Sequence, residues 1–235
     1  MQFLLCLANI VDLGRYRDKH NKKTIYYKLA LDESLTLKGN IDYTKFDYAG
    51  FYFREYYQDF ASEEDYLEEF EENHTGVMVK DFNLTNLDSI EKPIQESYNL
   101  EIKNKVEKVN DLVFVNPFLF EQIEENPFKM EERKYPVDFA YNRNRYLISQ
   151  ISLPANFVVE EIPAPIVMRL PDKSASVRIQ HQVSHNTLTT IYKFNIDKPV
   201  FMPDEYSFLK QLYAQIIKKQ AEPVIFKINT DAASL

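Results

Sequence analysis

Apolar and polar residues alternate with a period of two on both sides of a short turn at 32–34. This period is typical of a β-strand with one buried and one solvated face, so we predict an antiparallel hairpin here. Further runs predict strands at 77–84, 94–102 and 111–115. The residues on the apolar face of the hairpin are Ile25, Tyr27, Leu29, Leu31, Leu35, Leu37, Gly39, Ile41 and Tyr43.

The period becomes helical between residues 47 and 73. Ser62, followed by acidic residues at 63–65, resembles a capping box and predicts the start of a second helix. Gly76 follows as a stop signal. The aromatic residues at helical spacing in the first helix are Tyr48, Phe51, Tyr52, Tyr56 and Phe60, and the second helix is expected to bury Tyr66, Leu67 and Phe70.

A proline-rich stretch at 116–139 divides the chain, and in it Asn-Pro-Phe occurs twice. Each proline removes a backbone donor and pushes the preceding residue into an extended conformation, so neither a regular helix nor a central strand is predicted. The residues that need burial here are Phe118, Phe120, Phe128, Tyr135, Val137 and Phe139. We therefore predict a rigid, packed crossing between two β-rich halves.

The second half is again β-rich. The pattern predicts a hairpin that turns at 184–186, and a helix capped by Asp204 whose apolar stripe covers a sheet. In the hairpin, Val177, Ile179, His181 and Val183 are expected to pair with Leu188, Thr190, Tyr192 and Phe194. The predicted strands are 146–153, 157–162, 166–170, 175–184, 187–196 and 224–228.

These patterns predict a mainly β fold, a β-rich α+β protein, of two antiparallel sheet or sandwich units that each carry a covering helical segment. The basic stretch at 15–23 is expected to be a solvated loop. The predicted divisions are an N-terminal segment 1–23, irregular or a remnant of an upstream element; a first unit 24–115 with helices near 48–73; the crossing 116–140; and a second, sandwich-like unit 141–235 with a helix near 204–219.

Composition narrows the possible partners. The chain has 235 residues and a formal net charge of -8, which disfavours nucleic acid because that ligand requires a clustered basic surface. A single cysteine, Cys6, excludes an internal disulfide framework and a cysteine-based zinc site.

The apolar run at 1–11 lacks a basic start and a cleavage pattern, so it is not predicted to be a signal peptide, and it is too short to span a bilayer. A start inside an element that continues upstream is the alternative.

No catalytic, cofactor-binding or metal-binding set emerges from residue spacing. No two histidines have metal-ligand spacing on one element, and the glycine-rich nucleotide and nucleophile motifs are missing. Cys6 lies in an apolar run typical of a buried, inert cysteine. His20 is expected in a charged loop, His74 at a helix end, His185 in a turn, and His181 on an apolar strand face as a hydrogen-bonded core residue.

The acidic side chains near the second helix are interpreted as a helix start and a solvated face, without a calcium loop. The 16 tyrosines could stack on sugars, although the chain has no tryptophan, the best platform. These acidic residues are Asp59, Glu63, Glu64, Asp65, Glu68, Glu69, Glu71 and Glu72.

The order of several proline and aromatic motifs resembles the C-terminal domain of unknown function in exported bacterial transglutaminase-like proteins. The stretches L-x-L-x-G-x-I-x-Y at 35–43 and YAGFYFRE at 48–55 resemble the region that joins this domain to the transglutaminase-like core. The remaining motifs are NPF at 116–118, ENPFK at 125–129, R-x-YPVDF at 133–139, LP at 153–154, F-x-VEEIP-x-P at 157–165, LPDKSA at 170–175 and EY-x-x-LK-x-x-Y at 205–213.

The resemblance implies a periplasmic or cell-surface protein and a non-catalytic accessory module that packs on a transglutaminase-like or protease-like core or guides its substrate. The Cys-His-Asp core of that family is absent, and Cys6 lacks the surroundings of its nucleophile, so no catalytic role transfers to any residue. The alternative is a free-standing module that binds a cell-surface glycan or peptide. The sequence leaves the ligand, the oligomeric state, and the choice among fragment, split gene and free-standing protein open.

Overall fold

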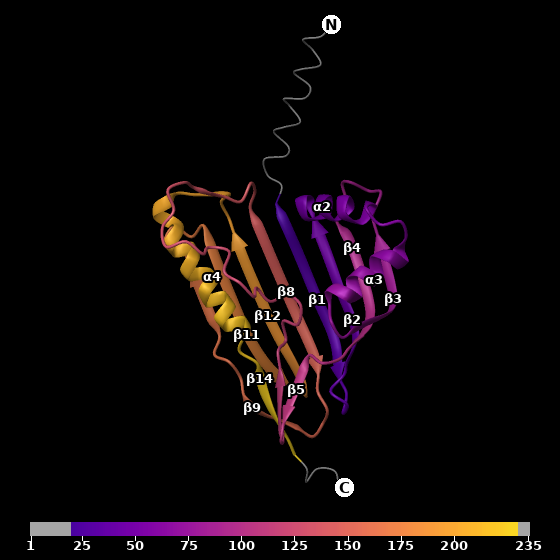
Figure 1. The fold of residues 1–235 in the computed structure, drawn as a ribbon. Coiled ribbons are helices and arrows are strands. Elements are labelled where there is room, and N and C mark those ends of the chain that lie inside the picture. The colour runs from indigo at the N-terminus through magenta and orange to yellow at the C-terminus, as the bar shows by residue number, and fades with distance from the viewer. Residues whose placement is uncertain (1–19, 230–235) are drawn as a thin grey trace.

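The computed structural model describes residues 20–229, and it is built around one eight-stranded sheet (Figure 1). The strand order is β10-β11-β12-β8-β1-β2-β4-β3. The predicted class, a β-rich α+β fold, is confirmed. The strands of this sheet are β1 (Asn21–Leu31), β2 (Leu37–Phe46), β3 (Val77–Thr85), β4 (Ile94–Ile102), β8 (Arg143–Ser152), β10 (Ile166–Arg169), β11 (Ala175–Ser184) and β12 (Thr187–Ile196).

The middle of the sheet joins the two predicted units. β1 and β8 pair in parallel, with Ile25 opposite Leu147, so strands from both halves of the sequence form one mixed sheet. The expectation of purely antiparallel sheets is wrong at this position. The crossing returns the chain to the end of the sheet at which β1 begins, where the backbone N–H of Asn21 donates to the carbonyl of Asn142 (2.9 Å). We call the β1–β8 pair the seam.

Most strands lie where the alternation of apolar and polar residues predicted them. The β11–β12 hairpin has the predicted register, with Val177 opposite Phe194 and His181 opposite Thr190. Its turn residues His185 and Asn186 have φ of 47° and 54°, as a two-residue hairpin with a right-handed strand twist requires.

Three expectations about local structure need correction. The basic stretch is not a loop throughout, because β1 begins at Asn21, where its backbone pairs with β2 and β8. A short strand, β5 (Val106–Val109), was missed since its two central residues are charged. Asp204 lies in the 3-10 helix η1 (Pro203–Glu205) and does not cap α4, while the Glu205 side chain accepts from the Met202 N–H (2.8 Å).

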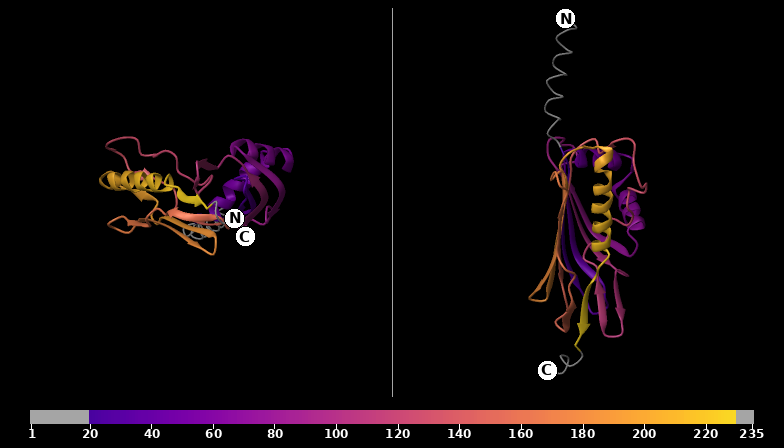
Figure 2. Two further views of the ribbon diagram at one scale, coloured as in Figure 1. Left: turned by 90° about the horizontal axis from the view of Figure 1, so that it is seen from below. Right: turned by 90° about the vertical axis from the view of Figure 1, so that its left-hand side faces the viewer.

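The helices α2 (Asp47–Gln58), α3 (Glu63–Asn73) and α4 (Tyr206–Gln220) all cover the same face of the large sheet, the inner face (Figure 2). Ser62 caps α3 as predicted, since its hydroxyl accepts from the Asp65 N–H (3.1 Å). α2 buries Phe53, whereas Phe51, Tyr52 and Tyr56 of its predicted aromatic stripe are exposed.

The two Asn-Pro-Phe tripeptides of the crossing make the same contact with α4. Asn116 donates to the carbonyl of Gln220 (2.8 Å), and Asn126 donates to the carbonyl of Lys210 (2.9 Å). Each asparagine also accepts from the N–H of the phenylalanine two residues later, and Phe118 and Phe128 are buried. Tyr135 contradicts the expected burial, because it is 77% exposed.

Two small sheets complete the fold. The first has the order β5-β6-β14-β9, and the second pairs β13 with β7. The remaining strands are β6 (Leu112–Val115), β7 (Val137–Asp138), β9 (Phe157–Glu161), β13 (Val200–Phe201) and β14 (Val224–Ile228).

Candidate functional site: a cationic cleft at the seam

Charged residues continue the inward-facing register of the central strands. On β1, Lys23 has the same orientation as Ile25 and Tyr27, which are fully buried. It lies opposite Arg145 of β8 on one side and Lys45 of β2 on the other. Three cations therefore stand side by side on neighbouring strands of the inner face.

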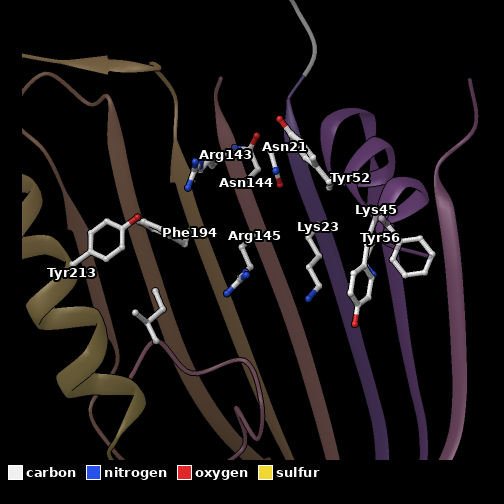
Figure 3. A pocket seen from close by; sticks show the side chains of 13 residues that line it. Asn21, Lys23, Lys45, Tyr52, Tyr56, Arg143, Asn144, Arg145, Phe194 and Tyr213 are labelled. Carbon is white, nitrogen blue, oxygen red and sulfur yellow. The ribbon is translucent and has the colours of Figure 1, made fainter. Parts of the chain in front are cut away.

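These cations line an open cleft of about 470 Å³ between α2 and α4. In Figure 3, the ends of Arg145 and Lys23 lie between Tyr213 of α4 and Tyr56 of α2. Arg143, next along β8 on the same face, adds a fourth cation. The other lining residues are Asn21, Ala49, Tyr52, Phe53, Ile123, Asn144 and Phe194.

A buried carboxylate from the crossing partly neutralises this row. Glu121 is 7% exposed and accepts from Lys23 (3.0 Å), with the Arg145 guanidinium 3.7 Å away. Burial alone would raise the pKa of Glu121, but the attraction of Lys23 and Arg145 outweighs it and lowers that pKa. Glu121 is therefore held ionised, and it fixes the Lys23 and Arg145 side chains on the floor of the cleft.

Lys45 belongs to a second buried group. Its ammonium lies 2.5 Å from Glu96, which is 2% exposed, and 3.7 Å from the centre of the Phe53 ring. The hydroxyls of Tyr66 (3.1 Å) and Tyr98 (2.8 Å) donate to the other oxygen of Glu96. Burial lowers the pKa of Lys45 to about 8, although Glu96 opposes the shift. Burial also raises the pKa of both tyrosines, so they remain hydroxyl donors.

Arg143 and Arg145 are the cations most open to a ligand. Arg143 is exposed, and its guanidinium donates to the Phe139 carbonyl (3.4 Å) and lies near the rings of Phe139 and Tyr141. The Arg145 side chain is 38% exposed. Guanidinium groups bind carboxylates and phosphates through paired N–H donors, so both residues are suited to hold an anion.

Aromatic side chains form one wall beside these charges. Tyr52 and Tyr56 of α2 are 47% and 42% exposed. Tyr141 stacks on Tyr48 with ring centroids 4.4 Å apart, which joins the start of β8 to α2. The cleft thus offers cationic donors on its floor and exposed tyrosine rings at its edge.

The residues singled out in the sequence lie mostly elsewhere. His20 is bonded through Nδ1 to Asn144 (3.1 Å), and His185 is in the exposed hairpin turn. His181 is half-buried and makes the expected kind of hydrogen bond, with Thr190 (2.8 Å). His74, at the end of α3, donates to the Phe70 carbonyl (2.6 Å), and mainly burial lowers its pKa. Cys6 lies outside the described residues.

Glu63, Glu64 and Asp65 lie in the first turn of α3, as expected for acidic residues at a helix start. Glu71 also accepts a hydrogen bond from the Val79 N–H (2.6 Å). Within residues 20–229, no group of three or more His, Cys, Asp or Glu side chains could hold a metal ion. No helix in the same range is long and apolar enough to cross a membrane.

Sequence reasoning missed all six charged residues of the site. A signal was present, because the alternation of the central strands, continued past their apolar residues, reaches an inward charge at Lys23, Lys45, Arg143 and Arg145. On β4, Glu96 occupies an inward position between the buried residues Ile94 and Tyr98. Glu121 offered no such signal, since it lies in a segment without a period.

Comparison with known families concerns the second half of the chain. Residues 111–226 match the DUF3858 family model. That family is described as a domain of unknown function with a solved structure. The DUF3858 match includes the crossing, β8, β12 and α4, and hence Glu121, Arg143 and Arg145, whereas Lys23 and Lys45 precede it.

One solved structure is weakly similar. It is a crystal structure from Parabacteroides distasonis ATCC 8503, described as a "putative protease", with 14% sequence identity and a TM-score of 0.37. The alignment covers 42% of this chain and 19% of that one. No curated protein matches the chain.

Proposed function

We propose that this protein is a non-catalytic binding module and that its cationic cleft holds an acidic segment of a polypeptide. The observation that carries the proposal is the charge of the cleft. Among the residues that the structure describes, Lys23, Lys45, Arg143 and Arg145 form ion pairs only with Glu96 and Glu121, so the site is positive in a chain whose formal net charge is -8.

The shape of the cleft favours a polypeptide over a small anion. It is open, and the exposed rings of Tyr52 and Tyr56 line it on one side while the guanidinium groups of Arg143 and Arg145 line it on the other (Figure 3). An extended acidic segment can place carboxylates on the arginines and apolar groups on the tyrosines.

The resemblance to the tail of transglutaminase-like proteins supports a more specific partner. On this proposal the acidic segment belongs to a transglutaminase-like or protease-like core, or to its substrate, and the module acts outside the cell.

Glu121 prepares the site for binding. It holds the side chains of Lys23 and Arg145 in place before the partner binds, which limits the loss of side-chain conformational entropy on binding.

The test is a titration of the purified chain with a hexaglutamate peptide, followed by NMR shifts of β8 residues. We expect saturable binding that weakens steeply with salt, because exposed charge pairs are screened. Arg143→Glu/Arg145→Glu should abolish it, whereas Lys28→Glu/Lys108→Glu, a matched reversal of two exposed cations away from the cleft, should not. Equal affinity in the two variants would overturn the proposal.

The same preparation tests the non-catalytic part of the proposal. We expect no amidase, protease or acyl-transfer activity, and no change in Cys6→Ala. Thiol-dependent turnover that disappears in Cys6→Ala would contradict it.

A further inference from the structure

A second cleft of about 860 Å³ lies over the same central strands, and most of the side chains that line it belong to the outer face of the sheet. Neighbouring residues of a strand alternate between faces, so Lys22 faces outward beside inward Lys23. In the same way, Lys193 precedes inward-facing Phe194 on β12. The outer cleft therefore opens on the other face of the sheet, although Lys23, Asn144 and Arg145 line both clefts.

The outer cleft contains cations without acidic partners. Among residues 20–229, none of Lys22, Arg178 and Lys193 forms an ion pair. All three are exposed. Of the described residues that line the cleft, Asp47 alone is acidic.

Neutral polar groups surround these cations. Asn144 donates to Asn195 across β8 and β12 (3.0 Å), and Gln180 accepts from the Arg178 guanidinium (2.6 and 3.0 Å). Tyr146 lies opposite Lys193 and contributes an aromatic side chain to the cleft. Amides hydrogen-bond to hydroxyl groups in both directions, and an aromatic face packs on the apolar face of a sugar ring.

We propose that the outer cleft binds an acidic polysaccharide built from uronic acid residues. Lys193 and Arg178 are direct cross-strand neighbours, so their backbones are about 5 Å apart. This spacing is close to one sugar ring, so cations on successive strands meet the carboxylates of successive uronic acids. Asn144, Asn195 and Tyr146 then contact the ring hydroxyls and the ring face. The proposal concerns the outer face of the sheet and rests on Lys22, Arg178 and Lys193, none of which lines the cationic cleft.

The experiment uses the full chain and polygalacturonate as the probe, with binding measured by calorimetry and by shifts of the Tyr146 amide signal. Neutral dextran of matched length is the ligand control. We expect binding of polygalacturonate alone, weakened by about tenfold or more in Arg178→Glu/Lys193→Glu, since two charge contacts are reversed. The exposed pair Lys28→Glu/Lys108→Glu should stay within about twofold of the wild type.

Three results would overturn the proposal. The first is equal affinity for dextran, which would leave the cations without a role. The second is loss of binding in Arg143→Glu but not in Arg178→Glu/Lys193→Glu, which would place the polysaccharide in the cationic cleft, because Arg143 lines that cleft and not the outer one. The third is hexaglutamate binding as tight as that of polygalacturonate and equally sensitive to Arg178→Glu/Lys193→Glu, which would show a surface that accepts any polyanion.

Discussion

The two halves of the large sheet cover the same inner face in different ways. Over β10, β11 and β12, the cover is apolar and comes from Leu209, Leu212 and Ile216 of α4 together with Phe118 and Phe128 of the crossing. Over β2, β3 and β4, Tyr66 of α3 joins a buried polar group whose other members, Lys45, Glu96 and Tyr98, belong to β2 and β4.

The difference shows where binding chemistry can develop in this fold. Apolar contacts stabilise in proportion to the buried area, and each contributes largely on its own. A buried polar group is stable only when every member has its partner, because an unpaired buried charge is very unfavourable. At the seam neither cover is complete, and the charges of the polar half continue into the open cleft.

The largest effect should come from the apolar half. Phe118 is fully buried, and its ring packs edge-on against Tyr192 with centroids 5.7 Å apart. We expect Phe118→Ala to lower the free energy of unfolding by about 3–5 kcal/mol, because it removes buried area and leaves a cavity. Urea denaturation measures this loss. Tyr135→Ala, in the same crossing but on the surface, should change it by less than about 0.5 kcal/mol.

A smaller but cooperative effect is expected in the polar half. Glu96→Gln removes the counter-charge of buried Lys45, and we expect a loss of about 3 kcal/mol in the free energy of unfolding. Because Lys45→Met in the same chain removes the stranded charge, the double variant should recover about 1–3 kcal/mol relative to the sum of the single variants. Strict additivity in this double-mutant cycle would show that the two residues act independently.

The smallest expected effect is a pH dependence of the free energy of unfolding that arises from His181 in the apolar half. Burial lowers the pKa of His181 from 6.5 to about 4, with Glu222 opposing the shift. The folded state therefore binds the proton more weakly than the unfolded state, so stability falls as the pH drops from 6.5 toward 4 and is unaffected above that range. The loss from this residue is at most roughly 3 kcal/mol. His181→Phe should flatten this part of the stability curve, and an unchanged curve would contradict the assignment.

Strand pairings between adjacent segments of the chain were predictable from sequence, whereas pairings between distant segments were not. Hairpins were predicted correctly because their register follows from adjacent alternating segments, as at 175–184 and 187–196. The seam pairs Ile25 with Leu147, and no local pattern specifies that contact or its parallel direction. The mixed sheet was therefore not foreseen.

The candidate site was not predicted from sequence for a different reason. A net charge of -8 averages over the whole chain and does not reveal the cations that gather on the central strands. Lys23 and Arg145 are far apart in sequence and become neighbours only through the seam. Glu121 joins them from a segment whose path is fixed by asparagine contacts to α4.

The seam also bears on the synthesis of the chain. The strands β1 to β4 are translated well before β8, so the hydrogen-bonding edge of β1 that later pairs with β8 emerges from the ribosome without its partner. An unpaired strand edge is a template for pairing with other chains, and contacts distant in sequence form slowly. The charges Lys22 and Lys23 at the start of that edge discourage such pairing, because like charges on two copies repel. The cations at the seam would therefore protect the nascent chain from aggregation before they serve any ligand.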